Sequence, residues 1–312
     1  MPVYGTHKAV QDDRNEKILI YVNGELFPRN EAKISVFDSG YLVGDGIWEA
    51  LRLHNGVLVF LDEHLNRLWQ AAATVGMDLK MTRAELTDRL WQTLRANDMH
   101  DGVHVRFMVT RGTKKTPSQD PRLVLSGPNL VIIPEYKQAS PDTRNRGVTL
   151  FTSTIRRGSP DYLDPRLNCH SKLHEVMALV QALEAGADEA LMLDIHGFVA
   201  TCNATNFFMV RRGEVWTSTG DYCLGGITRA NVIALCREAG IPVFEKSFSL
   251  TDTYGADEAF VTGTFAGVVP VHAIDGRHIR DGRGPMVERL QRLYLELVAR
   301  DVEARAHLQP AP

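Results

Sequence analysis

The chain has 312 residues, 44% of them hydrophobic and 23% charged, an ordinary composition for a globular protein of about two domains. Its formal net charge of −3 and its lack of Lys/Arg runs give no electrostatic case for a partner that is nucleic acid or an anionic membrane. Its four cysteines form no C-x-x-C pair, and no signal peptide or stretch of ~20 apolar residues that could cross a bilayer is recognisable, so we expect a cytoplasmic protein without a structural zinc site.

The first half of the chain has the pattern of strands followed by two helices. After a polar stretch at 1–16, expected as a flexible lead, apolar and polar residues alternate around Asn-Gly turns, which predicts strand–turn–strand units. From Asp62 the apolar residues repeat at helical spacing, and Thr82 with Glu85 forms a capping box that predicts a second helix. We assign these elements to a small N-terminal domain over 17–135. Its expected strands lie in 17–38, 47–61, 102–112 and 129–136.

The segment 136–147, YKQASPDTRNRG, is polar and turn-rich, so we expect it to link two domains. Residues 148–312 form a second, larger domain. Its expected strands lie in 148–157, 189–202, 206–218 and 258–276, and its expected helices in 174–186, 228–240 and 285–305. Strands clustered with helices beside them predict two α+β domains, whose interface is a common place for a ligand pocket.

Two glycine-rich turns in the second half are candidate phosphate sites. In LGGITRANV (224–232) two glycines and Thr228 open a helix, where backbone N–H groups attract anions. In VTGTFAG (261–267) Thr264 lies between glycines after a strand and offers a hydroxyl beside further amides. Neither spacing matches a nucleotide-binding motif, so the pair suits one small phosphorylated cofactor. An ordinary helix cap and an ordinary turn are the alternatives.

Four basic side chains stand out by their positions. His64 and Arg67 lie three residues apart on one face of a predicted helix, as surface pairs also do. His104, Arg106 and Met108 share one face of a predicted strand. Because an arginine on a strand face is costly to bury without an anionic partner, Arg106 is a candidate carboxylate clamp.

Other polar residues have simpler explanations. Asp38 and Tyr41 surround a glycine-rich turn, where Tyr41 is either close to a cofactor or a core tyrosine. Asp194 and His196 occupy a predicted hairpin turn and are better explained as turn residues than as catalysts. No Ser/His/Asp arrangement and no metal-ligand spacing stands out.

Taken together, these segments resemble the class IV aminotransferases, the fold type IV pyridoxal phosphate enzymes, over roughly residues 18–280. That group includes branched-chain and D-amino-acid aminotransferases and aminodeoxychorismate lyase. The resemblance implies an α+β, fold type IV architecture, in which a homodimer of two-domain subunits holds pyridoxal 5'-phosphate at the domain interface. It also implies an aminotransferase-like enzyme acting on a small amino acid, amine or keto acid. The segments that carry it are 21–68, 185–210, 223–229 and 256–271.

By the resemblance, four residues would hold the phosphate of the cofactor. Arg67 would be the phosphate-binding arginine. Ile227 and Thr228 would contribute from the GGITR turn, and Thr264 from the GTFAG turn.

The resemblance also implies a substrate side. Tyr41, Phe265 and Ala266 would border the substrate. Arg106 matches the arginine of the YIRP strand of branched-chain members, which lies near the substrate carboxylate. The D-amino-acid enzymes instead use an arginine and a histidine just beyond a TRGT stretch. Here KKTPSQD (114–120) stands in that place, which disfavours D-amino-acid specificity.

Two cofactor positions depart from the family pattern. The family's glutamate on the pyridine nitrogen is replaced by Thr201, and a hydroxyl cannot stabilise a pyridinium as a carboxylate does. When residues 164–193 are aligned without a gap to family members, the position of the family's Schiff-base lysine is occupied by Asn168. Lys172 lies four residues later, in a column where several members carry a tyrosine that approaches the cofactor's ring hydroxyl. Lys172 would then be a relocated Schiff-base lysine.

Three hypotheses therefore remain open from the sequence. The first is an aminotransferase that uses Lys172. The second is an enzyme of the same fold with different chemistry, which binds pyridoxal phosphate non-covalently, or another phosphorylated ligand, with His170 or Cys169 as proton carrier. The third is a non-catalytic binding or regulatory homologue that keeps the dimer and the phosphate cradle.

Overall fold

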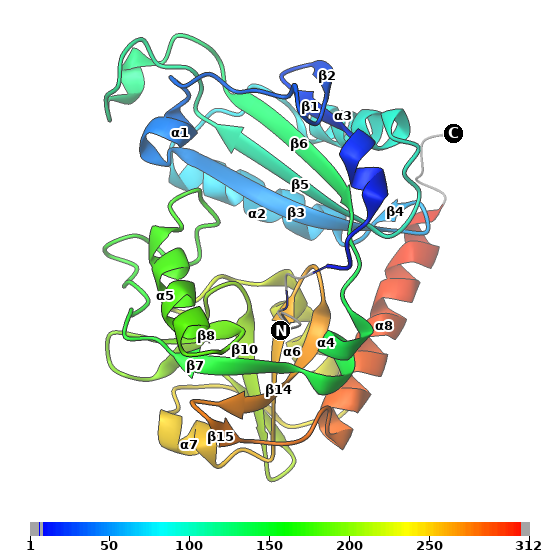
Figure 1. Ribbon diagram of the computed structural model, residues 1–312, viewed down its shortest axis with the longest axis vertical. Helices are drawn as coiled ribbons and strands as arrows, with labels where there is room; N and C mark the ends of the chain where they lie inside the picture. The colour runs from blue at the N-terminus through cyan, green and yellow to red at the C-terminus, as the bar shows by residue number, and fades with distance from the viewer. Residues whose placement is uncertain (1–5, 7–8, 307–312) are drawn as a thin grey trace. The chain divides into compact units, whose positions relative to one another are not determined.

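The computed structural model describes residue 6 and residues 9–306. These residues form two compact units (Figure 1). The small unit holds residues 11–137, 167–171 and 300–306. The large unit holds residues 138–166 and 172–299, with the described residues before position 11. Residues 1–5, 7 and 8 of the expected lead, and the last six residues of the chain, lie outside the described residues.

The small unit is built on a six-stranded antiparallel sheet with the strand order β2-β1-β6-β5-β3-β4. Both expected strand–turn–strand units are confirmed, since β1 pairs with β2 and β3 with β4. The strands are β1 (Leu19–Val22), β2 (Glu25–Pro28), β3 (Gly46–His54), β4 (Val57–Leu58), β5 (Val103–Thr110) and β6 (Asn129–Tyr136).

Helices α2 (Leu61–Thr74) and α3 (Arg83–Ala96) supply the apolar core of the small unit together with one face of this sheet. Every second residue of β5 enters that core, as the pleat of a strand requires. The capping box predicted at Thr82 and Glu85 is present at the start of α3. Core residues on the facing elements are Leu65, Leu68, Leu86, Leu90, Leu94, Leu51, Val103, Val105, Phe107 and Val109.

Short helical segments of the small unit were not expected from the sequence. They are η1 (Asp13–Lys17), α1 (Ser39–Val43) and η2 (Pro121–Leu123). Helix α1 begins where the side chain of Asp38 accepts hydrogen bonds from the backbone N–H groups of Gly40 and Tyr41. It ends at Gly44, whose positive φ of 72° suits glycine.

The large unit contains a mixed sheet of nine strands, in the order β12-β11-β10-β13-β14-β7-β8-β9 with β15 paired to β14. The pairs β11/β12, β14/β7 and β7/β8 are parallel. The strands are β7 (Val148–Thr152), β8 (Glu189–Leu193), β9 (Val199–Cys202), β10 (Asn206–Arg211), β11 (Glu214–Thr217), β12 (Val243–Glu245), β13 (Glu258–Gly263), β14 (Gly267–Ile274) and β15 (Arg277–His278).

The three helices predicted for the large unit are confirmed: α5 (Leu173–Glu184), α6 (Ile227–Glu238) and α8 (Pro285–Arg305). Helix α5 packs on β7 and β8, and α6 packs on β12 and β13. The residues of α8 from Arg300 onward are grouped with the small unit. The short helices α4 (Pro141–Arg146) and α7 (Leu250–Tyr254) were not predicted.

Two segments differ from the expected domain plan. The boundary between the small and the large unit falls inside the expected linker. That segment nevertheless contains helix α4, which is capped by the side chain of Ser140 and in which Thr143 is buried. Residues 167–171, expected in the large domain, are grouped with the small unit. They extend the free edge of β3, because Trp48 N donates to Asn168 O (3.1 Å) and His170 N donates to Gly46 O (2.9 Å).

Candidate functional site

The position expected for the family's lysine is a structural asparagine in the small unit. The Asn168 side chain donates from Nδ2 to Trp48 O (2.7 Å), while its buried Oδ1 has no partner among the described residues. The indole of Trp48 donates in return to Cys169 O (3.1 Å). An amide in this arrangement holds the added strand in place and cannot form a covalent bond to an aldehyde.

Lys172 is the N-cap residue of α5 in the large unit, where its amine is ion-paired. Lys172 Nζ lies 3.3 Å from Glu175 Oε1, and Arg157 Nη1 lies 2.7 Å from the same oxygen. His174 Nδ1 lies 2.9 Å from Glu175 Oε2. Burial alone would raise the pKa of Glu175, but His174, Lys172 and Arg157 together lower it to about 2. The carboxylate beside Lys172 is therefore charged at neutral pH, and attack by this amine requires that the pair separate.

Thr201, in the place of the expected glutamate, already uses its hydroxyl. Its Oγ1 donates to Thr205 O (2.8 Å), and the hydroxyl of Thr205 donates to Glu189 Oε2 (2.7 Å). All three residues are buried in the large unit. Burial raises the pKa of Glu189 to about 7, although the hydrogen bond from Thr205 opposes the rise.

The GGITR turn forms the N-terminus of α6, as predicted. Gly226 is the N-cap and no side chain caps the helix, so its first backbone N–H groups are available to an anion. A Cβ at Gly226 would collide with Oδ1 of the Asn206 side chain, which would have to move to make room for it. Thr228 is buried with its Oγ1 3.5 Å from the hydroxyl of Tyr294. This donor set fits a phosphate group.

The GTFAG turn joins β13 to β14, and it is tied to α6 through one tyrosine of α8. The ring of Tyr294 lies beside Gly267, at the end of this turn, while its hydroxyl approaches Thr228. Both predicted phosphate turns therefore meet on Tyr294. Thr264 is half-buried, whereas Phe265 and Ala266 are buried in the apolar core of the large unit.

Arg67, in the small unit, is held by a buried glutamate of β3. Its guanidinium donates from Nε to Glu49 Oε1 (2.6 Å) and from Nη2 to Glu49 Oε2 (2.7 Å). His64 Nδ1 lies 2.7 Å from Glu49 Oε2. Burial disfavours the charged form of Glu49 and would raise its pKa. The charges and hydrogen bonds of Arg67 and His64 outweigh burial, so the pKa of this carboxyl is lowered. Two nitrogens of Arg67 are thus committed to joining α2 to the sheet.

Arg106 lies on the other face of the same sheet and has a different environment. Its guanidinium carbon is 4.2 Å from the ring centroid of Trp48, a cation–π contact. Among the described residues no hydrogen bond or ion pair reaches this half-buried side chain. Burial lowers the pKa of Arg106, partly offset by the charge of Glu135. Tyr41, on α1, is 73% exposed.

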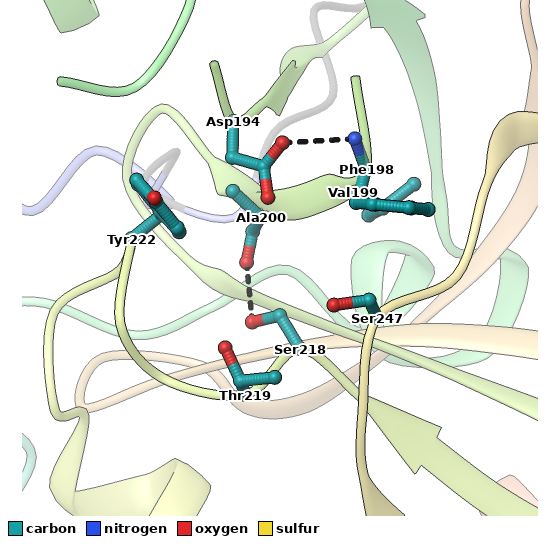
Figure 2. Close-up of a pocket in the computed structure, with 8 residues that line it drawn as sticks. All are labelled: Asp194, Phe198, Val199, Ala200, Ser218, Thr219, Tyr222 and Ser247. Carbon is teal, nitrogen blue, oxygen red and sulfur yellow. Dashed lines mark hydrogen bonds between the residues drawn. The ribbon is translucent and has the colours of Figure 1, made fainter. Parts of the chain in front are cut away.

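Asp194 and His196 are turn residues, as predicted. Figure 2 shows Asp194 with the other residues that line the small cavity beside it. Asp194 Oδ1 accepts from His196 N (2.8 Å) and from Phe198 N (2.9 Å), which closes the turn between β8 and β9. Beside it Ser218 donates to Ala200 O (2.7 Å), and the cavity between them holds only about 10 Å³. This place has no room for a substrate.

Some of these contacts were not predicted from the sequence. Glu175 follows Lys172 by three residues, a spacing that places two side chains on one helical face and could have revealed the pair. Trp48, Glu49 and Tyr294 have no local signal, because their partners are distant in the sequence. Among the described residues no group of His, Cys, Asp or Glu could hold a metal ion. No described helix is long and apolar enough to cross a membrane.

The chain matches the family model "Amino-transferase class IV" over residues 46–274, and it therefore belongs to the class IV aminotransferases. It is 40% identical to branched-chain-amino-acid aminotransferase-like protein 2 of Arabidopsis thaliana over 284 residues, 91% of this chain and 51% of that one. It is 38% identical to a putative branched-chain-amino-acid aminotransferase of Methanocaldococcus jannaschii, over 89% of this chain and 96% of that one.

Its fold is that of solved class IV enzymes. The branched-chain amino acid aminotransferase of Thermobaculum terrenum, in its holo form with PLP, superposes with a TM-score of 0.81 at 26% identity, over 94% of this chain and 97% of that one. The expected α+β, fold type IV architecture is thereby confirmed. The chain spans about half the length of the two Arabidopsis relatives.

Proposed function

We propose that the protein is a pyridoxal 5'-phosphate-dependent, aminotransferase-like enzyme that acts on a small amino acid or keto acid. The bound cofactor would supply the electron sink through which an amino group passes between amino acid and oxo acid. Membership of the class IV family and similar structures solved with PLP or with pyridoxamine 5'-phosphate support this proposal.

The observation that carries the proposal on the substrate side is the environment of Arg106. A half-buried guanidinium without an ion pair or hydrogen bond among the described residues, offset only in part by the charge of Glu135, gains from a ligand that supplies a carboxylate. A carboxylate matches the planar donors of arginine in a bidentate geometry. Arg106 would therefore bind the substrate carboxylate, with Tyr41, Phe265 and Ala266 bordering the substrate.

The phosphate of the cofactor would be held by the two turns that meet on Tyr294. Backbone N–H groups of Ile227 and Thr228 open α6, and the hydroxyls of Thr228 and Thr264 add further donors. Arg67 would contribute the part of its guanidinium that Glu49 does not occupy. Thr201 and Asn168 would border the cofactor without the chemistry of the glutamate and lysine that the family pattern has in those places.

Lys172 would be the amine that attaches the cofactor, once it leaves Glu175. The test is to add pyridoxal 5'-phosphate to the full chain, reduce with borohydride and locate the modified residue by mass spectrometry. We expect the modification on Lys172, its loss in Lys172→Ala, and its retention in the control Lys33→Ala, an exposed lysine of the small unit. If borohydride fixes no cofactor to the wild-type chain, Lys172 has no such role.

A second candidate function is binding of the cofactor without covalent attachment. Asn168 in the lysine position and the ion pair of Lys172 with Glu175 favour it. In that case the wild-type chain would bind the cofactor, and Lys172→Ala would bind it equally. Turnover of amino and keto acids by that protein would indicate lysine-independent chemistry, and binding without turnover would favour a regulatory role.

A further inference from the structure

Glu175, in the first turn of α5, is a buried carboxylate that three basic side chains of the large unit surround. Arg157 Nη1 and Lys172 Nζ share its oxygen Oε1, at distances of 2.7 Å and 3.3 Å. His174 Nδ1 lies 2.9 Å from the other oxygen, Oε2. One anionic group and three basic groups therefore meet where α5 begins.

Arg157 is the buried member of this cluster, and each nitrogen of its guanidinium has an acceptor. The residue is 3% exposed. Its Nε donates to Tyr222 O (3.3 Å) and its Nη2 donates to Pro165 O (3.3 Å). Its Nη1 donates to Glu175 Oε1 and also lies 3.1 Å from His174 Nε2. Because these acceptors belong to separate segments of the chain, the guanidinium is fixed and its charge stays beside Glu175.

The contact with Arg157 also determines where the His174 ring carries its proton. A guanidinium can only donate, so Nε2 of His174 accepts and has no proton. The proton of the neutral ring is then on Nδ1, the atom that faces Glu175 Oε2. Arg157 on Oε1 and His174 on Oε2 therefore remain beside the carboxylate when Lys172 moves away from it.

Lys172 is the outer member of the cluster and the more weakly held one. Its side chain is 30% exposed, and its contact with Glu175 is longer than that of Arg157. Among the described residues, Glu175 is the only group that the amine contacts. The Arg157 cation on the same oxygen reduces the attraction between Glu175 and the Lys172 ammonium. Separation of Lys172 therefore leaves no buried charge without a partner.

We propose that Glu175 restrains the Lys172 amine in its protonated, unreactive form and that Arg157 weakens this restraint, so that the two side chains together set the reactivity of Lys172. The inference rests on the proposed function, in which Lys172 attaches the cofactor. Burial works against the charge of Glu175, but its three basic neighbours lower its pKa to about 2, so it does not take up the proton of Lys172 at neutral pH. That proton goes to solvent. Glu175 and Arg157 are positioning residues that act through Lys172.

The first experiment measures the reactivity of Lys172 without any cofactor. Trace acetic anhydride, which reacts with unprotonated amines, labels the full chain at pH 7, and mass spectrometry compares Lys172 with exposed Lys33 in the same digest. Glu175→Gln removes the charge and keeps an oxygen for Arg157, so we expect Lys172 to react about three- to tenfold faster. Glu184→Gln, at an exposed glutamate of the same helix, removes an equal charge and leaves the rate unchanged.

Variants of Arg157 should change the rate in the opposite direction. Arg157→Gln leaves Lys172 as the only cation on Oε1 of Glu175, so we expect acetylation of Lys172 to slow about threefold, and Arg157→Lys should restore most of the wild-type rate. A purely structural role would loosen the start of α5 in both the Glu175 and the Arg157 variant and shift both rates the same way. Glu175→Gln tests the restraint even where Arg157→Gln does not fold. At pH 10, where lysine amines in general begin to lose their protons, all differences should shrink.

The inference is overturned if Glu175→Gln leaves the acetylation of Lys172 unchanged or slows it, if Arg157→Gln speeds it, or if the differences are as large at pH 10 as at pH 7. Attachment of pyridoxal 5'-phosphate by borohydride is measured in the same proteins. Faster acetylation of Lys172 in Glu175→Gln, with no cofactor fixed to the wild type or the variant, would refute the proposed attachment and leave the restraint standing. Cofactor fixed to Lys172, with acetylation indifferent to Glu175→Gln, would do the reverse.

Discussion

Two arginines of the small unit, Arg67 and Arg106, show that the partner of a charged side chain decides what that side chain can bind. Arg67 and Arg106 both appear in the sequence as candidate anion binders. Arg67 is paired with Glu49, so its charge is largely neutralised inside the protein. Arg106 rests on Trp48 and makes no ion pair or hydrogen bond among the described residues, and the charge of Glu135 offsets its burial only in part. At the scale of single residues, Arg106 is therefore the better candidate for the proposed carboxylate site.

Replacement of Arg106 by Met removes the charge and keeps much of the side-chain length. We expect the dissociation constant of 4-methyl-2-oxopentanoate to rise about 10- to 100-fold, because a hydrogen bond to a charged group contributes about 1.5–3 kcal/mol. Calorimetry on the full chain measures this. Arg166→Met, at an exposed arginine of the large unit, is the control, and equal losses in both variants would contradict the assignment.

Glu189 makes stability depend on pH in an unusual direction. Its pKa is about 7 in the folded chain, against an ordinary value of 4.5. Between those pH values the folded chain holds a proton that the unfolded chain has lost, so the free energy of unfolding falls as pH rises from about 4.5 to about 7. The difference corresponds to about 3 kcal/mol.

Glu189→Gln should remove that dependence. Chemical denaturation at pH 5 and pH 8 would show a smaller loss of stability at pH 8 in the variant than in the wild type. The buried His64 and His170, whose pKa values are lowered, act in the opposite direction in both proteins and cancel in the comparison. Glu184→Gln, an exposed position on α5, should behave as the wild type. Identical pH profiles for wild type and Glu189→Gln would show that this carboxyl titrates normally.

At the scale of secondary structure, helices and strands with regular spacing were predictable and short helices were not. The capping box of α3 and the alternation of β5 are local signals, and both are present in the structure. Helix α1 depends on Asp38, which Thr110 and Asn129 of distant strands hold in place. Helix α4 lies in a segment whose composition resembles a linker. Short helices of this kind need tertiary contacts, because the free-energy cost of nucleating a helix exceeds the free energy gained from the hydrogen bonds of a single turn.

The cap of α3 offers a test at this scale. Thr82→Ala removes the side chain that accepts from Glu85 N, and we expect a loss of about 1 kcal/mol in the unfolding free energy of the small unit. Urea denaturation followed by tryptophan fluorescence measures it. Thr87→Ala, at a half-buried threonine on the same helix whose hydroxyl donates to Arg83 O, is the control, and a comparable loss there would contradict a specific capping effect.

At the scale of the whole molecule, the homodimer expected from the family resemblance stays a prediction. We expect sedimentation at micromolar concentration to give twice the chain mass of 34.8 kDa. Apolar side chains exposed on α5, such as Leu173, Val176 and Val180, are compatible with burial in an assembly. Sedimentation as a single chain over the whole concentration range would exclude the dimer.

The sequence by itself determined the family, the α+β fold and most regular elements, and it led to the prediction that Asn168 and Thr201 stand in the places of the family's lysine and glutamate. Those features depend on local spacing and on order along the chain. Only the tertiary structure decided that residues 167–171 extend the sheet of the small unit and that Glu175 holds Lys172. It also decided that, among the described residues, Arg106 has Trp48 but no ion pair, and that the ring atom Nε2 of His170 has no hydrogen-bond partner. The physical reason is that the free energy of a charged or polar group depends on which groups the fold brings within a few ångströms. Most of these groups are far apart in the sequence.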